Sequence, residues 1–184
     1  SCSAVNKLIR RELWKESGFQ FPKGRYYEDL ATIPKVMTKT KKIVYLPEVY
    51  YYYLMRDGSI MHSRNFEKNY EDRTWAVDQL LEYFERENLI ETYRNELEYL
   101  VFENTYFVPS KEIVLNDRKS EYLKKFRDYA YNKFPQMNKN YYVQQIAGKD
   151  KILLKLLQYR MYGMMVLMSQ LRRMKDRLAA VSRR

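Results

Sequence analysis

Residues 24–36 have the sequence GRYYEDLATIPKV. The adjacent carboxylates Glu28 and Asp29 follow two tyrosines and stand directly before an apolar run. Acidic side chains in the first turn of a helix interact favourably with the helix dipole and with its free backbone N–H groups. The pattern predicts a helix from Glu28 to about Thr38, in which Pro34 is either tolerated near the start or produces a kink.

The same tripeptide, Tyr-Glu-Asp, occurs again at residues 70–72. A helix cap alone explains either copy, so the tripeptide does not by itself mark a site. The first copy follows a loop that contains Phe and Gly and precedes a β-type segment, whereas the second copy has neither. We therefore expect Asp72 to be an ordinary acid on the surface of a helix.

The composition is typical of a soluble globular protein with a mainly α fold. Apolar residues make up 46% and charged residues 31% of the 184 residues, and only five Gly and five Pro occur. So few turn-forming residues favour a bundle-like helical chain over a doubly wound fold. A short β element is expected near residues 42–54, where KIVYLPEVYYYYL combines β-branched and aromatic residues.

Apolar residues recur at helical spacing along most of the remaining chain. The expected helices are residues 3–15, 28–38, 66–108 with a break near Asn88, 117–134, 138–147 and 150–181. In the last segment, apolar residues alternate by three and four positions at Leu154, Leu157, Met161, Met164, Met168 and Leu171. So short a seam favours packing on the preceding helices, with a homodimer and an anionic membrane surface as the alternatives.

Positive charge gathers towards the C-terminus. The chain has 34 Lys and Arg against 23 Asp and Glu, a net charge of +11, and residues 149–184 contribute ten Lys or Arg and two Asp, or +8. The expected partners of this region are lipid head groups, nucleic acid or another anionic polymer. The residues expected to contact them are Lys155, Arg160, Arg172, Arg173, Lys175 and Arg177.

The sequence contains one cysteine, Cys2, and one histidine, His62. These numbers exclude an internal disulfide, the usual zinc clusters and a Cys/His nucleophile pair of ordinary spacing. The sequence shows no signal-peptide pattern and no apolar run long enough to span a bilayer. We expect a cytoplasmic protein, with peripheral attachment to the inner face of the cell membrane as an alternative.

Residues 6–61 contain four segments in order: NKL-x-RR, F-x-x-G-x-x-YED, KKIVYLPE and YYYY-x-x-x-x-GSIM. Together they resemble the C-terminal part of the catalytic domain of bacterial family 2 glycosyltransferases, which are inverting enzymes of GT-A fold. The resemblance covers about a third of the chain. It implies that residues 1–63 are the C-terminal portion of a GT-A-like α/β domain and that residues 64–184 are a helical C-terminal extension.

The resemblance also implies roles for individual residues. Asp29 is the candidate general base, and Glu28 would orient the loop or hydrogen-bond the acceptor. Arg56, Ser59 and His62 match a mobile segment that closes over the donor, where they would contact the diphosphate or the metal. The implied substrates are a nucleotide-sugar donor and a glycan or lipid-linked acceptor of cell-envelope polysaccharide biosynthesis.

One element of the resemblance is missing: no Asp-x-Asp motif, which holds the metal in this family, occurs in the 184 residues. We therefore expect the Mg²⁺ or Mn²⁺ ion and the donor site in a full-length parent, with none bound to this chain and His62 as the candidate ligand within it. The chain alone is expected to be inactive. The alternative is a non-catalytic basic helical module that binds an anionic membrane, a protein partner or, less favoured for want of a recognised motif, nucleic acid.

Overall fold

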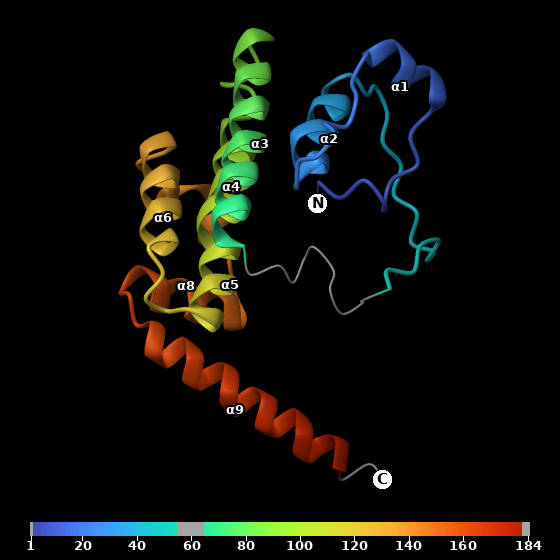
Figure 1. Cartoon of the computed structure of the whole chain (residues 1–184). Helices are drawn as coiled ribbons and strands as arrows, with labels where there is room; N and C mark the ends of the chain where they lie inside the picture. Colours follow the sequence, from blue (N-terminus) through green and yellow to red (C-terminus); the bar gives the residue numbers. More distant parts are fainter. Residues whose placement is uncertain (1, 55–64, 182–184) are drawn as a thin grey trace. The chain divides into compact units, whose positions relative to one another are not determined.

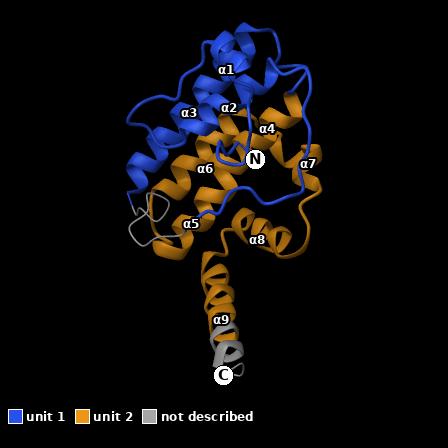
Figure 2. Cartoon of the chain, turned by 90° about the vertical axis from the view of Figure 1, so that its right-hand side faces the viewer, with its two compact units in different colours: residues 1–93 blue, residues 94–184 orange. Residues whose placement is uncertain are grey.

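The structure, a computed structural model, describes residues 2–54 and 65–181, with residues 176–181 as backbone only (Figure 1). Figure 2 shows two compact units, residues 1–93 and residues 94–184. Over the described ranges the chain is helical and contains no β-strand, which confirms the predicted mainly α fold. That residues 1–63 belong to a catalytic domain and residues 64–184 to a C-terminal extension remains a prediction.

The predicted β element near residues 42–54 is wrong. These residues run as irregular chain, and every one of them is exposed to solvent. A strand forms only when a neighbouring strand takes up its backbone N–H and C=O groups. The described part of the chain contains no strand with which residues 42–54 could pair, so their β propensity does not produce a strand.

Unit 1 contains α1 (Arg11–Ser17), α2 (Glu28–Thr38) and α3 (Phe66–Arg86). Helices α2 and α3 pack against each other, and α2 has the bounds predicted from its acidic first turn. Burial of a large aliphatic side chain contributes roughly 1.5–3 kcal/mol relative to exposure. The buried apolar residues are Leu30, Ala31, Ile33 and Val36 of α2 and Ala76, Val77, Leu80, Tyr83 and Phe84 of α3.

Helix α1 begins later than the predicted residues 3–15. The segment before it forms a separate turn, in which the Lys7 amide donates to the Ala4 carbonyl (3.2 Å) and the Lys7 ammonium donates to the Ser3 carbonyl (2.8 Å). Ser3 therefore belongs to this turn and does not cap the helix. Gly18, in the left-handed region with φ 67°, ends α1.

Unit 2 begins with an almost continuous helical rod that is followed by shorter helices. Its elements are α4 (Arg94–Phe102), η2 (Glu103–Phe107), α5 (Val108–Asn116), α6 (Tyr122–Lys133), η3 (Met137–Lys139), α7 (Tyr141–Gln144), α8 (Gly148–Gln158) and α9 (Tyr162–Val181). The π-helical turn η2 ends two residues before Pro109, whose missing amide hydrogen cannot continue an α-helical ladder. Phe102, Phe126, Leu97, Ile113 and Met137 are among the core side chains.

The predicted helix over residues 150–181 is interrupted at Arg160, which has φ 55°. The Arg160 amide donates to the Leu157 carbonyl (3.0 Å) and the Met161 amide to the Leu156 carbonyl (2.8 Å), the two hydrogen bonds of a Schellman motif. The predicted apolar seam is therefore not continuous. Its first part, with Leu157, is buried in α8, whereas Met164 in α9 is exposed.

The left-handed conformation of Arg160 predicts a stabilising substitution. A residue with a Cβ pays about 1–2 kcal/mol in this region, and glycine avoids that cost at the expense of greater freedom in the unfolded chain. We expect Arg160→Gly to raise the free energy of unfolding of unit 2 by about 0.5 kcal/mol, measured by urea unfolding followed by circular dichroism. Tyr159→Gly, at φ −84°, is the control and should lower it. An equal decrease in the free energy of unfolding in both variants would contradict the prediction.

Candidate functional site

The candidate site is the start of α2, where the first Tyr-Glu-Asp copy lies. Tyr27 is the N-cap residue and has left-handed backbone angles, φ 61° and ψ 30°, which are unusual for a residue with a side chain. Its carbonyl accepts the first helical hydrogen bond, from the Ala31 amide at 3.2 Å. Immediately afterwards Glu28 is exposed and Asp29 is half-buried. The chain thus turns sharply and presents two carboxylates in the first turn of the helix.

The carboxylate of Asp29 is held in place by the helix that it begins. Its Oδ1 accepts a hydrogen bond from the Leu30 amide at 2.8 Å, one of the amides that lack a partner within the helix. This hydrogen bond uses only one of the two carboxylate oxygens. Asp29 thus binds a free amide of the first turn, as expected for an acid there, although the N-cap residue is Tyr27 and no side chain caps the helix.

Lys7 brings a positive charge near this acid. Burial lowers the pKa of the Lys7 ammonium, while the charges of Cys2 and Asp29 act in the opposite direction and offset part of that effect. The ammonium donates to Asn6 Oδ1 at 2.8 Å as well as to the backbone of its own turn. Residues 6–11 carry one of the family-like segments, but that pattern alone does not predict the electrostatic interaction between Lys7 and Asp29.

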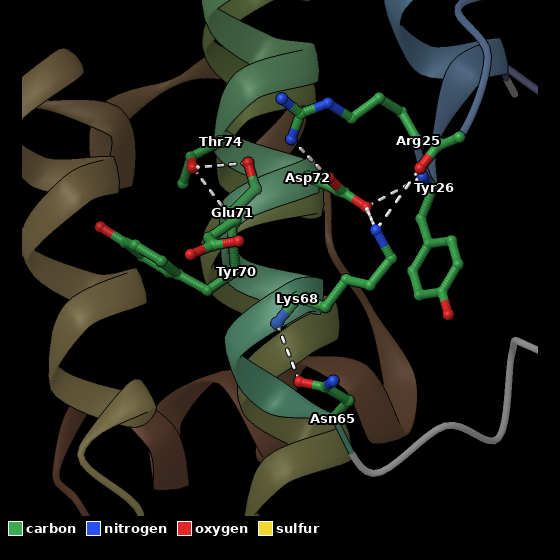
Figure 3. A network of polar contacts seen from close by, with 9 residues as sticks. Arg25, Tyr26, Asn65, Lys68, Tyr70, Glu71, Asp72 and Thr74 are labelled. Atoms are coloured by element: carbon green, nitrogen blue, oxygen red, sulfur yellow. Dashed lines mark hydrogen bonds and ion pairs between the residues drawn. The ribbon is translucent and has the colours of Figure 1, made fainter.

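Asp72 of α3 binds the loop that precedes α2 (Figure 3). Only 1% of its side chain is exposed. Its Oδ1 lies 2.8 Å from Arg25 Nη1, and its Oδ2 lies 2.8 Å from Lys68 Nζ and accepts from the Tyr26 amide at 3.0 Å. The expectation that Asp72 is a surface acid is therefore wrong, because its side chain points into the contact between α3 and the loop.

Aromatic rings extend the same contact. The Lys68 ammonium lies 4.6 Å from the centre of the Tyr26 ring, and the Arg73 guanidinium lies 4.3 Å from the centre of the Tyr27 ring. On the other side, the Arg25 guanidinium lies 5.1 Å from the Trp75 ring. Cation–π contacts of this kind contribute from about 0.5 to 2 kcal/mol each. Both tyrosines that precede Glu28, Tyr26 and Tyr27, thus contact cationic side chains of α3.

A signal for the buried position of Asp72 was present in the sequence. Asp72, Ala76 and Leu80 follow one another at intervals of four, which places the acid on the same face of α3 as two core residues. Lys68, four residues before Asp72, extends this row to the exposed end. An acid on the apolar face of a helix requires a partner that compensates its buried charge, and Arg25, itself 42% exposed, is that partner.

The remaining predicted site residues lie elsewhere. Arg56, Ser59 and His62 fall outside the described residues. Lys155 and Arg160 are exposed in unit 2, and Arg172, Arg173 and Lys175 are exposed along α9, whereas the side chain of Arg177 lies beyond the described ones. In the part of the chain that is described, no three His, Cys, Asp or Glu side chains form a group that could hold a metal ion.

A concave region of about 550 Å³ lies within unit 2. Along one wall, Asn138 Nδ2 donates to Tyr131 Oη at 2.8 Å and Gln158 Nε2 donates to Asn138 Oδ1 at 3.2 Å. Another wall includes Tyr106, whose pKa is raised mainly by burial. No sequence pattern predicted this pocket, because its walls come from four separate elements of unit 2.

The sequence is similar to part of the glycosyltransferase GlyG of Streptococcus pneumoniae serotype 4 (strain ATCC BAA-334 / TIGR4), with 30% identity over 112 residues. This chain resembles part of a glycosyltransferase. The match covers 50% of the chain and 34% of the relative, so the chain spans about a third of that protein's length. The sequence matches no family model, and no solved structure matches it.

The contact around Asp72 predicts a loss of stability when its charge is removed. Breaking a buried ion pair typically costs 3–5 kcal/mol, but Arg25 and Lys68 are 42% and 36% exposed, so we expect about 1–3 kcal/mol for Asp72→Asn. Both tryptophans, Trp14 and Trp75, lie in unit 1, so their fluorescence during urea unfolding reports this unit. Glu71→Gln, at the exposed neighbouring acid, is the matched control and should change the free energy by less than about 0.5 kcal/mol. Similar changes in unfolding free energy for Asp72→Asn and Glu71→Gln would contradict the stabilising role of Asp72.

The same contact predicts a pH dependence. Burial alone would raise the pKa of Asp72, but hydrogen bonds from Lys68, Arg25 and the Tyr26 amide outweigh it and lower the pKa overall. The stabilisation is therefore complete above the unfolded-state pKa of about 4 and is lost as the pH falls through the lower folded-state pKa. The difference in unfolding free energy between wild type and Asp72→Asn should shrink below about pH 4. A difference that stays constant down to pH 2 would contradict this.

Proposed function

We propose that this chain is the C-terminal part of the catalytic domain of an inverting family 2 glycosyltransferase of GT-A fold, together with a helical extension. The parent protein would transfer a sugar from a nucleotide-sugar donor to a hydroxyl group of a glycan or lipid-linked acceptor. The observation that carries this proposal is the Asp29 carboxylate, fixed at the start of α2 in a chain that is similar to a glycosyltransferase.

Asp29 would act as the general base. In an inverting transfer, the acceptor oxygen attacks the anomeric carbon from the face opposite the departing nucleotide diphosphate. The new O–C bond forms as the C–O bond to the diphosphate breaks, the electron pair leaves with the diphosphate, and the acceptor proton passes to the carboxylate. The hydrogen bond from the Leu30 amide to Oδ1 would orient the Asp29 carboxylate for this step. Glu28, which is exposed beside it, would hydrogen-bond the acceptor.

Asp72 would serve as a positioning residue. It does not reach the acceptor itself, but it binds Arg25 and the Tyr26 amide, directly before the turn that presents Glu28 and Asp29. A catalytic group misplaced by about 1 Å can lose about a hundredfold in rate. The contact with α3 would supply the rigidity that a general base needs.

The exposed segment 42–54 supports the view that the parent contains more than this chain. Its apolar side chains are extensively solvated, for example Tyr45 and Tyr52 at 85% and 86% exposure. We propose that in the parent the nucleotide-binding half covers this exposed apolar segment. The groups that select the donor and most of those that hold Mg²⁺ or Mn²⁺ would lie in that half, while Arg56, Ser59 and His62 would contact the diphosphate or the metal from this chain. Among the described residues, no three His, Cys, Asp or Glu side chains form a group for the ion.

The assignment of the base predicts a selective loss of activity. In the full-length parent, Asp29→Asn should lower kcat by about 10²–10⁴-fold, because an amide cannot accept the acceptor proton, while the Kd of the donor stays within about twofold. Glu71→Gln is the matched control on the other Tyr-Glu-Asp copy and should retain wild-type kcat. Wild-type turnover by Asp29→Asn would end the assignment.

The location of the donor site predicts the behaviour of this chain by itself. Because most of the donor-binding groups are proposed to lie elsewhere in the parent, calorimetry should detect no UDP-sugar binding by residues 1–184 at micromolar concentrations. Heat of binding with a micromolar Kd would place the donor site within this chain and contradict the proposed division.

A further inference from the structure

Helix α9 carries apolar side chains on two different faces. One face packs within unit 2: Met165 is only 2% exposed, and α9 contacts α5 and α8. The other face carries a second row, which we call the exposed stripe and define as Met164, Leu167, Leu171 and Met174, with exposures of 47%, 53%, 56% and 58%. Figure 2 shows α9 projecting away from the other helices of unit 2.

The spacing of the exposed stripe keeps it on one side of the helix. Its members follow one another at intervals of three, four and three residues, so they form a nearly straight apolar row. The buried Met165 lies about 100° around the helix from Met164, and the stripe extends from Met164 in the opposite direction. The two apolar faces are therefore distinct, and packing within unit 2 accounts for only one of them.

Cations accompany the exposed stripe. Arg172, Arg173 and Lys175 are exposed in the same part of α9 as Leu171 and Met174. The sequence contains no Asp or Glu from residue 151 to residue 175. An apolar row with bases around it and no intervening acid has the chemistry of a helix that lies in the interface of an anionic bilayer.

We propose that α9 docks on the surface of an anionic lipid bilayer, with the exposed stripe at the boundary between head groups and acyl chains and the bases against lipid phosphates. In the described residues, no helix is both long enough and apolar enough to cross a membrane. The proposal stands independently of the glycosyltransferase assignment, because a lipid surface needs neither a sugar donor nor an acceptor.

A second copy of this chain is a poorer occupant of the stripe. Lys175 lies four residues after Leu171, next to the stripe, and a helix–helix seam would desolvate its ammonium. The facing helix would bring further cations, and the sequence of α9 holds a single acid, Asp176, against four Lys or Arg. At a bilayer, Lys175 can extend its ammonium to the phosphates while its methylene groups stay with the stripe.

Nucleic acid also suits the stripe less well. Single strands bind to proteins through aromatic rings on which bases stack, whereas the stripe consists of Met and Leu. Contacts with nucleic-acid phosphates would involve only the Arg and Lys side chains. They would leave the four exposed apolar side chains of the stripe without a role. The apolar stripe and the neighbouring cations together therefore favour a lipid surface over a nucleic acid.

The experiment measures binding of the whole chain, residues 1–184, to sedimented vesicles. The vesicles contain phosphatidylcholine alone or phosphatidylcholine with about one-third phosphatidylglycerol, a composition that tests the charge requirement. We expect binding to the anionic vesicles only. Arg172→Gln/Arg173→Gln/Lys175→Gln should weaken it roughly a hundredfold, at about fivefold for each base.

A second pair of variants separates the stripe from general surface hydrophobicity. Leu167→Gln/Leu171→Gln, which leaves the charge unchanged, should weaken vesicle binding at least about tenfold. Leu115→Gln/Ile152→Gln is the matched control, since these side chains are 44% and 50% exposed in unit 2 but lie outside α9, and it should bind as wild type does. Circular dichroism melting curves check that all variants are folded.

The outcomes that overturn the proposal are distinct. Absence of binding to anionic vesicles, or equal losses in the stripe variant and its control, would exclude the stripe as the docking surface. A light-scattering mass of twice 22.6 kDa that returns to 22.6 kDa in Leu167→Gln/Leu171→Gln would assign the stripe to a homodimer. Vesicle binding that needs the bases but not the stripe, together with tighter retention on single-stranded RNA, would assign α9 to nucleic acid.

Discussion

A buried carboxylate that is shared by two cations organises unit 1. Asp72 lies on the apolar face of α3 and is almost fully removed from water, so its charge must be compensated from the loop that covers it. Arg25 and the Tyr26 amide supply that compensation, and Lys68 adds to it from the same helix. The loop and α3 therefore depend on each other, because neither side of the contact is satisfied without the other.

This dependence accounts for the unusual turn at the start of α2. Tyr27 adopts left-handed angles at a cost of about 1–2 kcal/mol, and the Arg73 guanidinium lies over its ring. With Tyr26 attached to Asp72 on one side of the turn and Leu30 buried on the other, the chain has little freedom in between. The geometry of Glu28 and Asp29 is thus largely a consequence of contacts made by their neighbours, to which Asp29 adds the hydrogen bond from the Leu30 amide.

The sequence predicted what depends on local pattern. The acidic first turn placed α2 correctly, and Asn88 marked the end of α3, where its left-handed angles form the helix cap. The end of α8 was missed because the residue in the equivalent position is Arg160, a residue type that rarely adopts such angles. Segment 42–54 was misjudged for a different reason: β propensity describes how a residue fits a sheet, and it cannot supply the neighbouring strand.

The role of Asp72 shows where a pattern-based argument about function is weakest. The sequence surroundings distinguish the two Tyr-Glu-Asp copies, but the burial of the second follows only from the four-residue spacing that places Asp72 with the core residues Ala76 and Leu80. A charged residue on an apolar face predicts a partner but does not identify it, and Arg25 is 47 positions away in the chain. Long-range pairing of this kind becomes visible only in the folded structure.

Amide hydrogen exchange, followed by NMR in residues 1–184, tests directly whether Asp72 holds the start of α2. The Tyr26 amide donates to Asp72 and the Leu30 amide to Asp29. Asp72→Asn should therefore accelerate exchange at both amides by roughly tenfold or more, while the Phe126 amide in unit 2 keeps its wild-type rate. Unchanged exchange at Tyr26 and Leu30 in Asp72→Asn would contradict the account, because the loop would then be held by something other than this ion pair.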